Sequence, residues 1–335
     1  MSAQLIDPRD GRRIEVGDDE SLLAAALRQG WNVAYSCRTG RCSSCRARVV
    51  AGETRALQPE LGLSAAEAAE GQVLSCVRTA RGEVQVELPL LRGPAQPPAR
   101  LWPCRIASLE RLAEDVLRVQ LRLPPSAAWR HEAGQFVDLI GPQGLQRSYS
   151  LANASGSLLE LHIRRVPKGQ FSSWWFEQAK PNDLLRLNGP LGTFVLRELE
   201  GRDLILLATG TGFAPVQAML QALDTLPSAQ QPRSLTLYWG GRQPADLYVA
   251  PSCTHPRWRY VPVLSRAGSD WGGQRGHVQQ VLLADAPDWA HCTVYACGNP
   301  AMVDGARAQL TAAGLPPDQF HADAFVPSAP RSATP

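Results

Sequence analysis

The sequence predicts a multidomain chain with an α+β domain, an antiparallel β-barrel and an α/β domain, in that order. Three observations lead to this prediction. Four cysteines gather between residues 37 and 76, several segments after residue 116 alternate between apolar and polar residues, and strand and helix patterns alternate after residue 201. A chain of 335 residues has room for two or three such domains.

Composition narrows the classes of function. The chain carries 34 basic and 31 acidic residues, and this near balance argues against nucleic acid or an anionic membrane as the main partner. The N-terminus lacks the pattern of a signal peptide, and the longest strongly apolar run, residues 204–208, is too short for a membrane helix. We therefore expect a cytoplasmic protein, in which clustered cysteines are metal ligands rather than disulfides.

The cysteines of the first domain have a specific spacing. Cys37, Cys42 and Cys45 form a C-x4-C-x2-C loop, and Cys76 follows at a distance. This is the plant-type ferredoxin spacing for a [2Fe–2S] cluster, in which each iron takes two thiolates. The alternative is a structural zinc site, but such sites usually pair two C-x2-C knuckles and only one is present. Gly40 is expected to take a positive φ in this loop.

The residues around the cysteines agree with a small domain over residues 1–90. We expect a helix over residues 21–29, a capping box from Ser64 to Glu67 and a strand over residues 84–88. The segment resembles a plant-type ferredoxin domain, which implies a β-grasp-like α+β fold. Arg38, Arg41, Arg46 and Arg48 lie around the cluster loop. They favour a reduced cluster or an acidic partner, or they form a solvated loop.

A proline-rich linker over residues 91–101 precedes the expected barrel, residues 102–199. Its strands are expected at residues 117–123, 135–140, 146–151, 158–164 and 183–188.

The α/β domain is expected over residues 200–327, followed by a disordered tail over residues 328–335. Strands at residues 204–208, 234–239, 260–264 and 293–296 alternate with helices at residues 216–223, 277–284 and 300–313.

One barrel strand carries Arg147, Ser148, Tyr149 and Ser150. In this position the four residues resemble the R-x-Y-S motif of the ferredoxin–NADP reductase superfamily. The resemblance implies an FAD-binding barrel, with Arg147 on the pyrophosphate, Tyr149 against the flavin and Ser150 near flavin N5. By itself the segment could equally be an ordinary amphipathic strand.

A second segment with Gly169, Gln170 and Ser172 resembles the same superfamily's phosphate-binding turn at a helix start. The alternative for Ser172 is simple N-capping of that helix.

The α/β domain carries nucleotide motifs after its apolar strands, which imply a Rossmann-like NAD(P)-binding domain. Thr209, Gly210, Thr211 and Gly212 resemble the superfamily's nicotinamide-nucleotide loop. Cys297 and Gly298 resemble its C-G-x-P motif beside the nicotinamide, where a small buried hydrophobe is the alternative for Cys297. Phe325 matches the superfamily's aromatic residue near the flavin, with a core phenylalanine as the alternative. Ser150, Cys297 and Phe325 are therefore the candidate catalytic residues.

Arg242, Ser265 and Arg266 follow the next strands and are candidates for the adenosine end of the coenzyme. An acidic residue there would favour NAD, and arginine with serine would favour NADP. No convincing acidic residue stands at the strand end. The resemblance favours NADH, and NADPH stays open.

The order of the three domains resembles the NADH-dependent reductase components of multicomponent oxygenases and related sugar-dehydratase reductases. This resemblance implies electron transfer from NADH through FAD to a [2Fe–2S] cluster. It also implies an electron-accepting protein, either an oxygenase component or a pyridoxamine-phosphate sugar dehydratase. A redox sensor and a self-contained enzyme are the alternatives. A redox sensor would need no path for hydride transfer. A self-contained enzyme would need an acid/base pair of its own, and the sequence offers no candidate for one.

Overall fold

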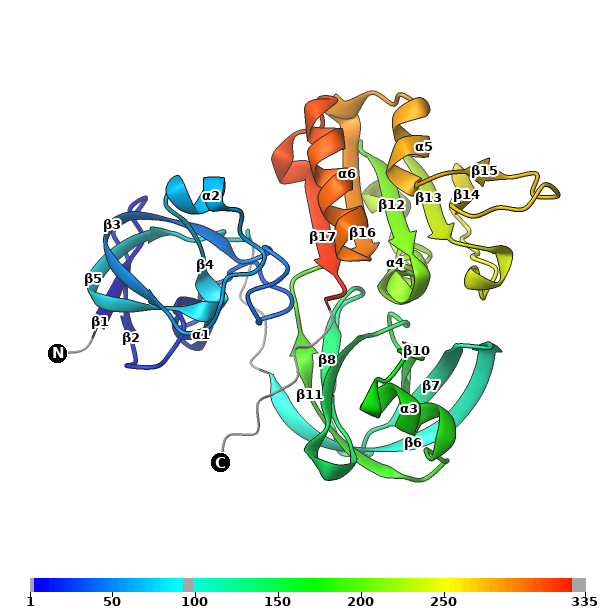
Figure 1. Ribbon diagram of the computed structural model, residues 1–335, viewed down its shortest axis with the longest axis horizontal. Coiled ribbons are helices and arrows are strands. Elements are labelled where there is room, and N and C mark those ends of the chain that lie inside the picture. Colours follow the sequence, from blue (N-terminus) through cyan, green and yellow to red (C-terminus); the bar gives the residue numbers. More distant parts are fainter. Residues whose placement is uncertain (1–2, 93–98, 327–335) are drawn as a thin grey trace. The chain divides into compact units, whose positions relative to one another are not determined.

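The computed structural model describes residues 3–92 and 99–326. The chain divides into two compact units, Met1–Pro98 and Ala99–Pro335 (Figure 1). Each unit is described by itself. The expected tail lies outside the described residues, and so does most of the expected linker.

The first unit is an α+β domain built on a five-stranded sheet in the order β2-β1-β5-β3-β4. The strands are β1 (Ala3–Ile6), β2 (Arg13–Val16), β3 (Arg46–Ala56), β4 (Gln72–Leu74) and β5 (Arg78–Glu87). β1 and β5 pair in parallel, and the other pairs are antiparallel.

Two helices belong to this unit, α1 (Leu22–Arg28) and α2 (Ala65–Ala69). The Ser21 hydroxyl caps α1 by accepting from the Ala24 N–H at 3.1 Å, and α1 buries its apolar face in the core. The capping box expected between Ser64 and Glu67 is present at the start of α2. Both helices therefore begin where the sequence predicts.

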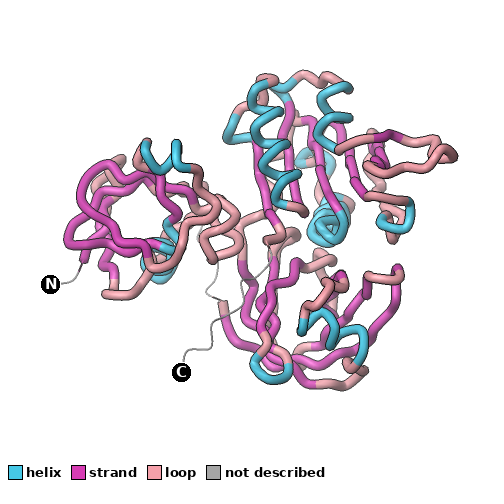
Figure 2. The backbone as a smooth tube through the Cα atoms, viewed as in Figure 1, coloured by secondary structure: helices cyan, strands magenta, loops and turns pink. Residues whose placement is uncertain are grey.

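The second unit begins with an antiparallel barrel (Figure 2). Its strands, in the order β10-β7-β6-β11-β8-β9, are β6 (Arg100–Ala113), β7 (Val116–Arg122), β8 (Phe136–Ile140), β9 (Gln146–Ser150), β10 (Leu158–Arg164) and β11 (Leu184–Leu191). A bridge between Leu151 and Leu161 joins the two edges of the sheet. Helix α3 (Gln170–Glu177) follows β10.

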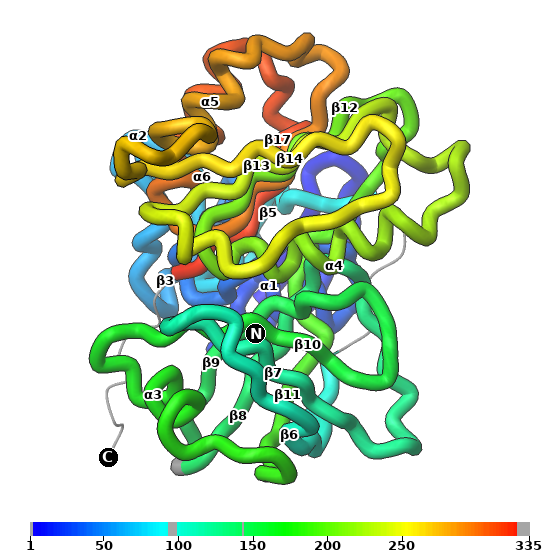
Figure 3. The backbone as a smooth tube through the Cα atoms, turned by 90° about the vertical axis from the view of Figure 1, so that its right-hand side faces the viewer, coloured from blue at the N-terminus to red at the C-terminus, as the bar shows by residue number. Residues whose placement is uncertain are grey.

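The rest of the second unit is an α/β domain with a six-stranded parallel sheet in the order β15-β14-β13-β12-β16-β17. The strands are β12 (Asp203–Thr209), β13 (Ser234–Gly241), β14 (Trp258–Leu264), β15 (Gln274–Arg275), β16 (Cys292–Gly298) and β17 (Phe320–Ala324). Helix α4 (Phe213–Leu223) packs on the face that carries Leu206 and Ala208. Helices α5 (Val278–Ala284) and α6 (Pro300–Ala312) contact each other and lie on the other face (Figure 3).

The predicted fold class is confirmed, and the expected linker differs in one respect. β6 begins at Arg100, inside the linker segment, and the Leu91 N–H donates to the Asn32 carbonyl of the first unit at 2.8 Å. Both ends of that segment are therefore part of folded structure. Among the described residues, no helix combines the length and apolar character that a membrane crossing requires.

Candidate functional site

The four predicted cluster cysteines form two neighbouring pairs in the first unit. Cys37 pairs with Cys42 and Cys45 with Cys76, and a hydrogen bond between the thiols links each pair. The hydrogen bond from Cys42 lowers the pKa of Cys37 to about 5, and the one from Cys76 lowers the pKa of Cys45. The four sulfurs therefore lie in two pairs, each within hydrogen-bonding distance.

The backbone of the loop is shaped around these sulfurs. The Cys37 N–H donates to Cys42 Sγ at 3.3 Å, and the Thr39 N–H donates to Cys37 Sγ at 3.4 Å. Gly40 has the expected positive φ of 69°, and a Cβ there would lie 2.6 Å from the Pro59 carbonyl oxygen. The loop can follow this path only with glycine at that position.

The donor set fits a [2Fe–2S] cluster better than a single metal ion. Within the described residues, no three His, Cys, Asp or Glu side chains are grouped to hold one ion. Two thiol pairs match the need of two irons for two thiolates each, and amide groups aimed at sulfur stabilise the negative charge of such a cluster. Cys37, Cys42, Cys45 and Cys76 remain the predicted ligands.

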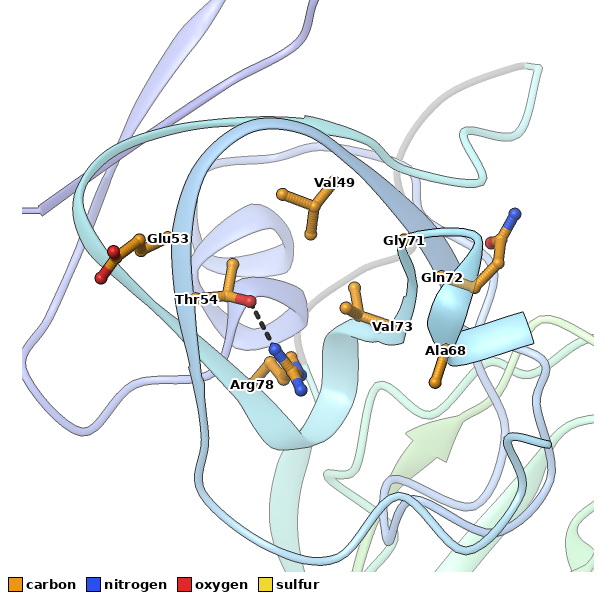
Figure 4. Close-up of a pocket in the computed structure, with 8 residues that line it drawn as sticks. All are labelled: Val49, Glu53, Thr54, Ala68, Gly71, Gln72, Val73 and Arg78. Atoms are coloured by element: carbon orange, nitrogen blue, oxygen red, sulfur yellow. Dashed lines mark hydrogen bonds between the residues drawn. The ribbon is translucent and has the colours of Figure 1, made fainter. Parts of the chain in front are cut away.

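A shallow pocket lies in the same unit, on β3, β4 and the start of β5 (Figure 4). Arg78 Nη1 donates to Thr54 Oγ1 at 2.6 Å inside it. None of the residues predicted to bind a cofactor lines this pocket.

The predicted FAD residues come from two elements of the barrel that touch through aromatic rings. Tyr149 of β9 makes edge contacts with Phe171 and Trp175 of α3, at centroid distances of 6.1 and 6.4 Å. Since α3 begins at Gln170 after Gly169, these contacts set Tyr149 beside the first turns of α3, and Arg147 lies two residues before Tyr149 on β9. Guanidinium groups and helix N-termini both suit phosphate, so the residues present fit FAD.

Two serines of the FAD motifs have local partners in the structure. Ser148 Oγ donates to the Asp138 carboxylate at 2.5 Å. Ser172 Oγ bonds to Gly169 and Val166, and the N-cap of α3 is Gly169 rather than Ser172. The alternative role of Ser172 as N-cap is therefore wrong, because its hydroxyl braces the preceding loop from inside the helix.

The nicotinamide-nucleotide loop packs closely against the end of β16. Thr209 ends β12, and Gly210, Thr211 and Gly212 form the turn before α4. A Cβ on Gly212 would lie 2.4 Å from the Cys297 carbonyl oxygen, and a Cβ on Gly298 would lie 2.3 Å from Thr209 Oγ1. The structure thus brings both predicted nucleotide motifs to one edge of the sheet, which fits a dinucleotide.

Two of the candidate catalytic residues, Ser150 and Cys297, meet at Asp323, to which the sequence reasoning assigned no role. Asp323 lies beside Cys297 in the sheet, and its carboxylate accepts from the Ser150 hydroxyl at 3.5 Å. The Phe325 N–H donates to the Gly298 carbonyl at 2.7 Å. Burial, with the Asp323 charge, raises the pKa of Cys297, so this thiol stays neutral.

The predicted adenosine-end residues also meet. The Arg266 N–H donates to the Arg242 carbonyl at 2.9 Å, and Ser265 N–H and Oγ both donate to the Gly241 carbonyl. A buried acidic residue, Asp246, lies in the turn that follows β13 and is 5 % exposed. Its carboxylate accepts from the Arg242 N–H at 2.8 Å and lies 3.4 Å from the Arg242 guanidinium.

Arg164 of β10 is another residue that sequence reasoning missed. Its guanidinium lies 3.3 Å from the Asp246 carboxylate and 3.3 Å from the position of a Cβ on Gly210. It therefore sets a positive charge beside the nucleotide loop. Arg164 also lies 3.3 Å from the Asp115 carboxylate of its own domain. No local sequence signal marks Arg164, because both acidic partners are distant from it in the sequence.

Three family models match the chain. A 2Fe-2S iron-sulfur cluster binding domain matches residues 5–81, an oxidoreductase FAD-binding domain residues 103–196 and an oxidoreductase NAD-binding domain residues 206–308.

Relatives match along the whole chain. The chain is 38% identical over 316 residues to the CDP-6-deoxy-L-threo-D-glycero-4-hexulose-3-dehydrase reductase of Yersinia pestis, covering 92% of this chain and 94% of the relative. It is 31% identical to reductase component 1 of the terephthalate 1,2-dioxygenase of a Comamonas species, covering 92% and 93%. A solved Amycolatopsis cytochrome P450 reductase covers 97% of this chain and 99% of its own, with 32% identity and a TM-score of 0.77.

Proposed function

The chain belongs to the iron–sulfur flavoprotein reductases that join a 2Fe-2S domain to FAD- and NAD-binding domains, and from this premise we propose how it works and which enzyme it serves. It transfers electrons from NADH through FAD to a [2Fe–2S] cluster and on to a partner enzyme. Bound FAD would supply the exchange between hydride transfer and the single-electron transfer that a cluster requires.

We propose that Ser150, Cys297 and Phe325 form the site of hydride transfer. The observation that carries this proposal is the meeting of β9, β16 and β17 at Asp323. The hydrogen bond between Ser150 and Asp323 holds a proton at this site. Asp323 is 5 % exposed, so little water reaches its carboxylate. Neutral Cys297 and the side-chain-free Gly298 allow a nicotinamide ring to approach closely.

The binding residues divide between the two domains of the second unit. Arg147, Ser148 and Tyr149, with Gly169, Gln170 and Ser172, are proposed to hold FAD. The loop of residues 209–212 is proposed to hold the coenzyme pyrophosphate, with Arg164 as an added cation. Arg242, Ser265 and Arg266 are proposed to contact the adenosine end.

We propose that the partner enzyme is a sugar dehydratase of the pyridoxamine-phosphate type. Support comes from the 38% identity with dehydrase reductases of two Yersinia species, against 30–34% for the relatives named as oxygenase or demethylase components. An oxygenase component is the second candidate. The need for NADH and for reduced thiols supports a cytoplasmic location.

Steady-state reduction of cytochrome c tests this function. The purified protein should reduce cytochrome c with NADH, and Cys42→Ser should abolish that reduction while NADH-driven reduction of ferricyanide by the flavin persists. Cys253→Ser, outside the cluster loop, is the matched control and should behave as wild type. A wild-type protein that oxidises no NADH, or a Cys42→Ser variant with full cytochrome c activity, would contradict the proposal.

A further inference from the structure

The loop around the cluster cysteines is positively charged within a neutral unit. Residues 1–98 contain twelve arginines and twelve acidic residues. Residues 37–48 contain four of those arginines and no acidic residue. Positive charge is therefore concentrated where the cluster ligands are, and negative charge is in excess over the rest of the unit.

Arg38 and Arg41 are the members of this group that lie inside the cysteine loop. In the described part of the chain neither forms an ion pair, whereas Arg46 pairs with Glu67 and Arg78 with Glu60 at 2.7 and 2.9 Å. Arg38 follows Cys37 directly, is exposed and has a positive φ of 56°. The loop thus displays two charges that the unit does not neutralise.

An exposed apolar side chain lies on the segment that supports the same loop. Leu61 is 63% exposed. The next residue, Gly62, donates to the Gly40 carbonyl at 2.9 Å, and a Cβ on it would lie 2.7 Å from the Arg41 backbone. Leu61 is therefore fixed beside the cysteine loop rather than on a separate surface.

We propose that Arg38, Arg41 and Leu61 form a docking face, here named the cluster-loop face, for an electron-accepting protein whose own redox centre is surrounded by acidic residues. The inference rests on the proposed function, since electrons that reach the cluster must leave through the surface nearest to it. Cys37 is only half-buried at this face. Two cations without an ion-pair partner steer an acidic partner, and the exposed Leu61 beside the loop strengthens the contact once water is excluded.

Charge reversal at one loop arginine tests the proposal, with two haem proteins of opposite charge as acceptors. The acidic probe is the soluble domain of cytochrome b5, and the basic probe is cytochrome c. Arg38→Glu is compared with Arg81→Glu, an equally exposed arginine outside the loop. At low salt, Arg38→Glu should lower the rate constant for cytochrome b5 about threefold to tenfold and raise that for cytochrome c, and high salt should remove both effects.

The internal electron path is measured separately, as reduction of the cluster by NADH without an acceptor. It should be unchanged in Arg38→Glu. If it falls instead, the face serves the chain's own flavin domain and the docking proposal is wrong. The proposal is equally overturned if Arg81→Glu has the same effect, or if both cytochromes are slowed alike.

Two further results keep the test decisive. If Arg38→Glu fails to assemble a cluster, Arg41→Glu replaces it in the same comparison. The salt dependence of the wild type is a second test. A wild-type rate constant with cytochrome b5 that does not fall as salt rises contradicts the proposal. A wild-type protein that reduces neither cytochrome would instead count against the proposed function itself.

Discussion

Asp246 is a buried carboxylate at the proposed adenosine end of the coenzyme site. It is surrounded by Arg242 and Arg164, and hydrogen bonds from Arg242 help to hold its pKa below the ordinary value against the opposing effect of burial. Arg242 is thereby paired with Asp246. If the adenosine end of the coenzyme binds at Arg242, as proposed, the Asp246 charge disfavours the 2′-phosphate of NADPH and favours NADH.

Replacing this carboxylate should relax the choice of coenzyme. Asp246→Ser frees Arg242, and we expect the ratio of kcat/KM for NADPH to that for NADH to rise at least tenfold, mainly through a lower KM for NADPH. Steady-state rates with both coenzymes provide the measurement. Asp270→Ser, at an exposed acidic residue of the same domain, should leave the ratio unchanged. An unchanged ratio in Asp246→Ser would show that the carboxylate plays no part in coenzyme choice.

His321 should make the α/β domain sensitive to acid. Burial, followed by the charge of Arg197, lowers its pKa from 6.5 to about 4. The unfolded chain therefore binds a proton below about pH 6.5 that the folded chain refuses until about pH 4, so stability is lost as the pH falls through this window.

Between about pH 7.5 and 5, this single group should cost about 2 kcal/mol of the free energy of unfolding. Denaturant melts at both pH values measure the loss, and His321→Gln should reduce it by about that amount. His291→Gln, at an exposed histidine, should not. An identical loss in wild type and His321→Gln would refute the assignment.

The sequence identified some residues because their signal is local. The four cysteines were predicted as ligands from spacing alone, since three ligands can come from one tight loop, and the structure brings them together in two pairs. Asp323 and Asp246 were missed because an isolated acidic residue has no local pattern, and the Ser150 partner of Asp323 is 173 positions away.

At the scale of elements, strand β10 joins the barrel to the α/β domain. Glu160, His162 and Arg164 alternate along one face of the strand. Glu160 accepts from Gln217, His162 bonds to Tyr248 and Arg164 pairs with Asp246, with distances of 2.9, 3.0 and 3.3 Å. Three successive polar contacts therefore fix the strand that carries Arg164 against the nucleotide loop.

The turn between β12 and α4 should tolerate no side chain at Gly212. A methyl group would collide with the Cys297 backbone and push the turn away from β16. We expect Gly212→Ala to raise the KM for NADH at least tenfold while the FAD and cluster absorbance stays at wild-type level.

The matched control is Gly268→Ala, since nothing lies within 4 Å of a Cβ at that position. Steady-state NADH oxidation with ferricyanide measures both variants. Wild-type KM values in Gly212→Ala would mean that the close approach is not needed for coenzyme binding.

Helices and strands with a clear periodic pattern of apolar residues were predicted from the sequence. Short or proline-containing strands were not. β10 and α5 lie within a residue of the expected bounds. β1, β2 and β4 have three or four residues each, too few to show a period. β6 contains Pro103 and follows a proline-rich segment, so its start was assigned to the linker.

At the scale of the whole molecule, the order of domains follows the order of electron carriers in reverse. The cluster domain comes first, the FAD barrel second and the NAD-binding domain last. This order was predictable because each domain carries its own motif. The contacts that join the barrel to the α/β domain were not, because they depend on long-range pairs such as Ser150 with Asp323.

The most direct test of the central claim is EPR spectroscopy of the protein frozen at intervals after anaerobic mixing with NADH. The account predicts that the signal of a reduced [2Fe–2S] cluster appears after the flavin is reduced, and that Cys42→Ser shows flavin reduction without that signal. Flavin reduction with no cluster signal in the wild type, or an undiminished signal in Cys42→Ser, would contradict the account.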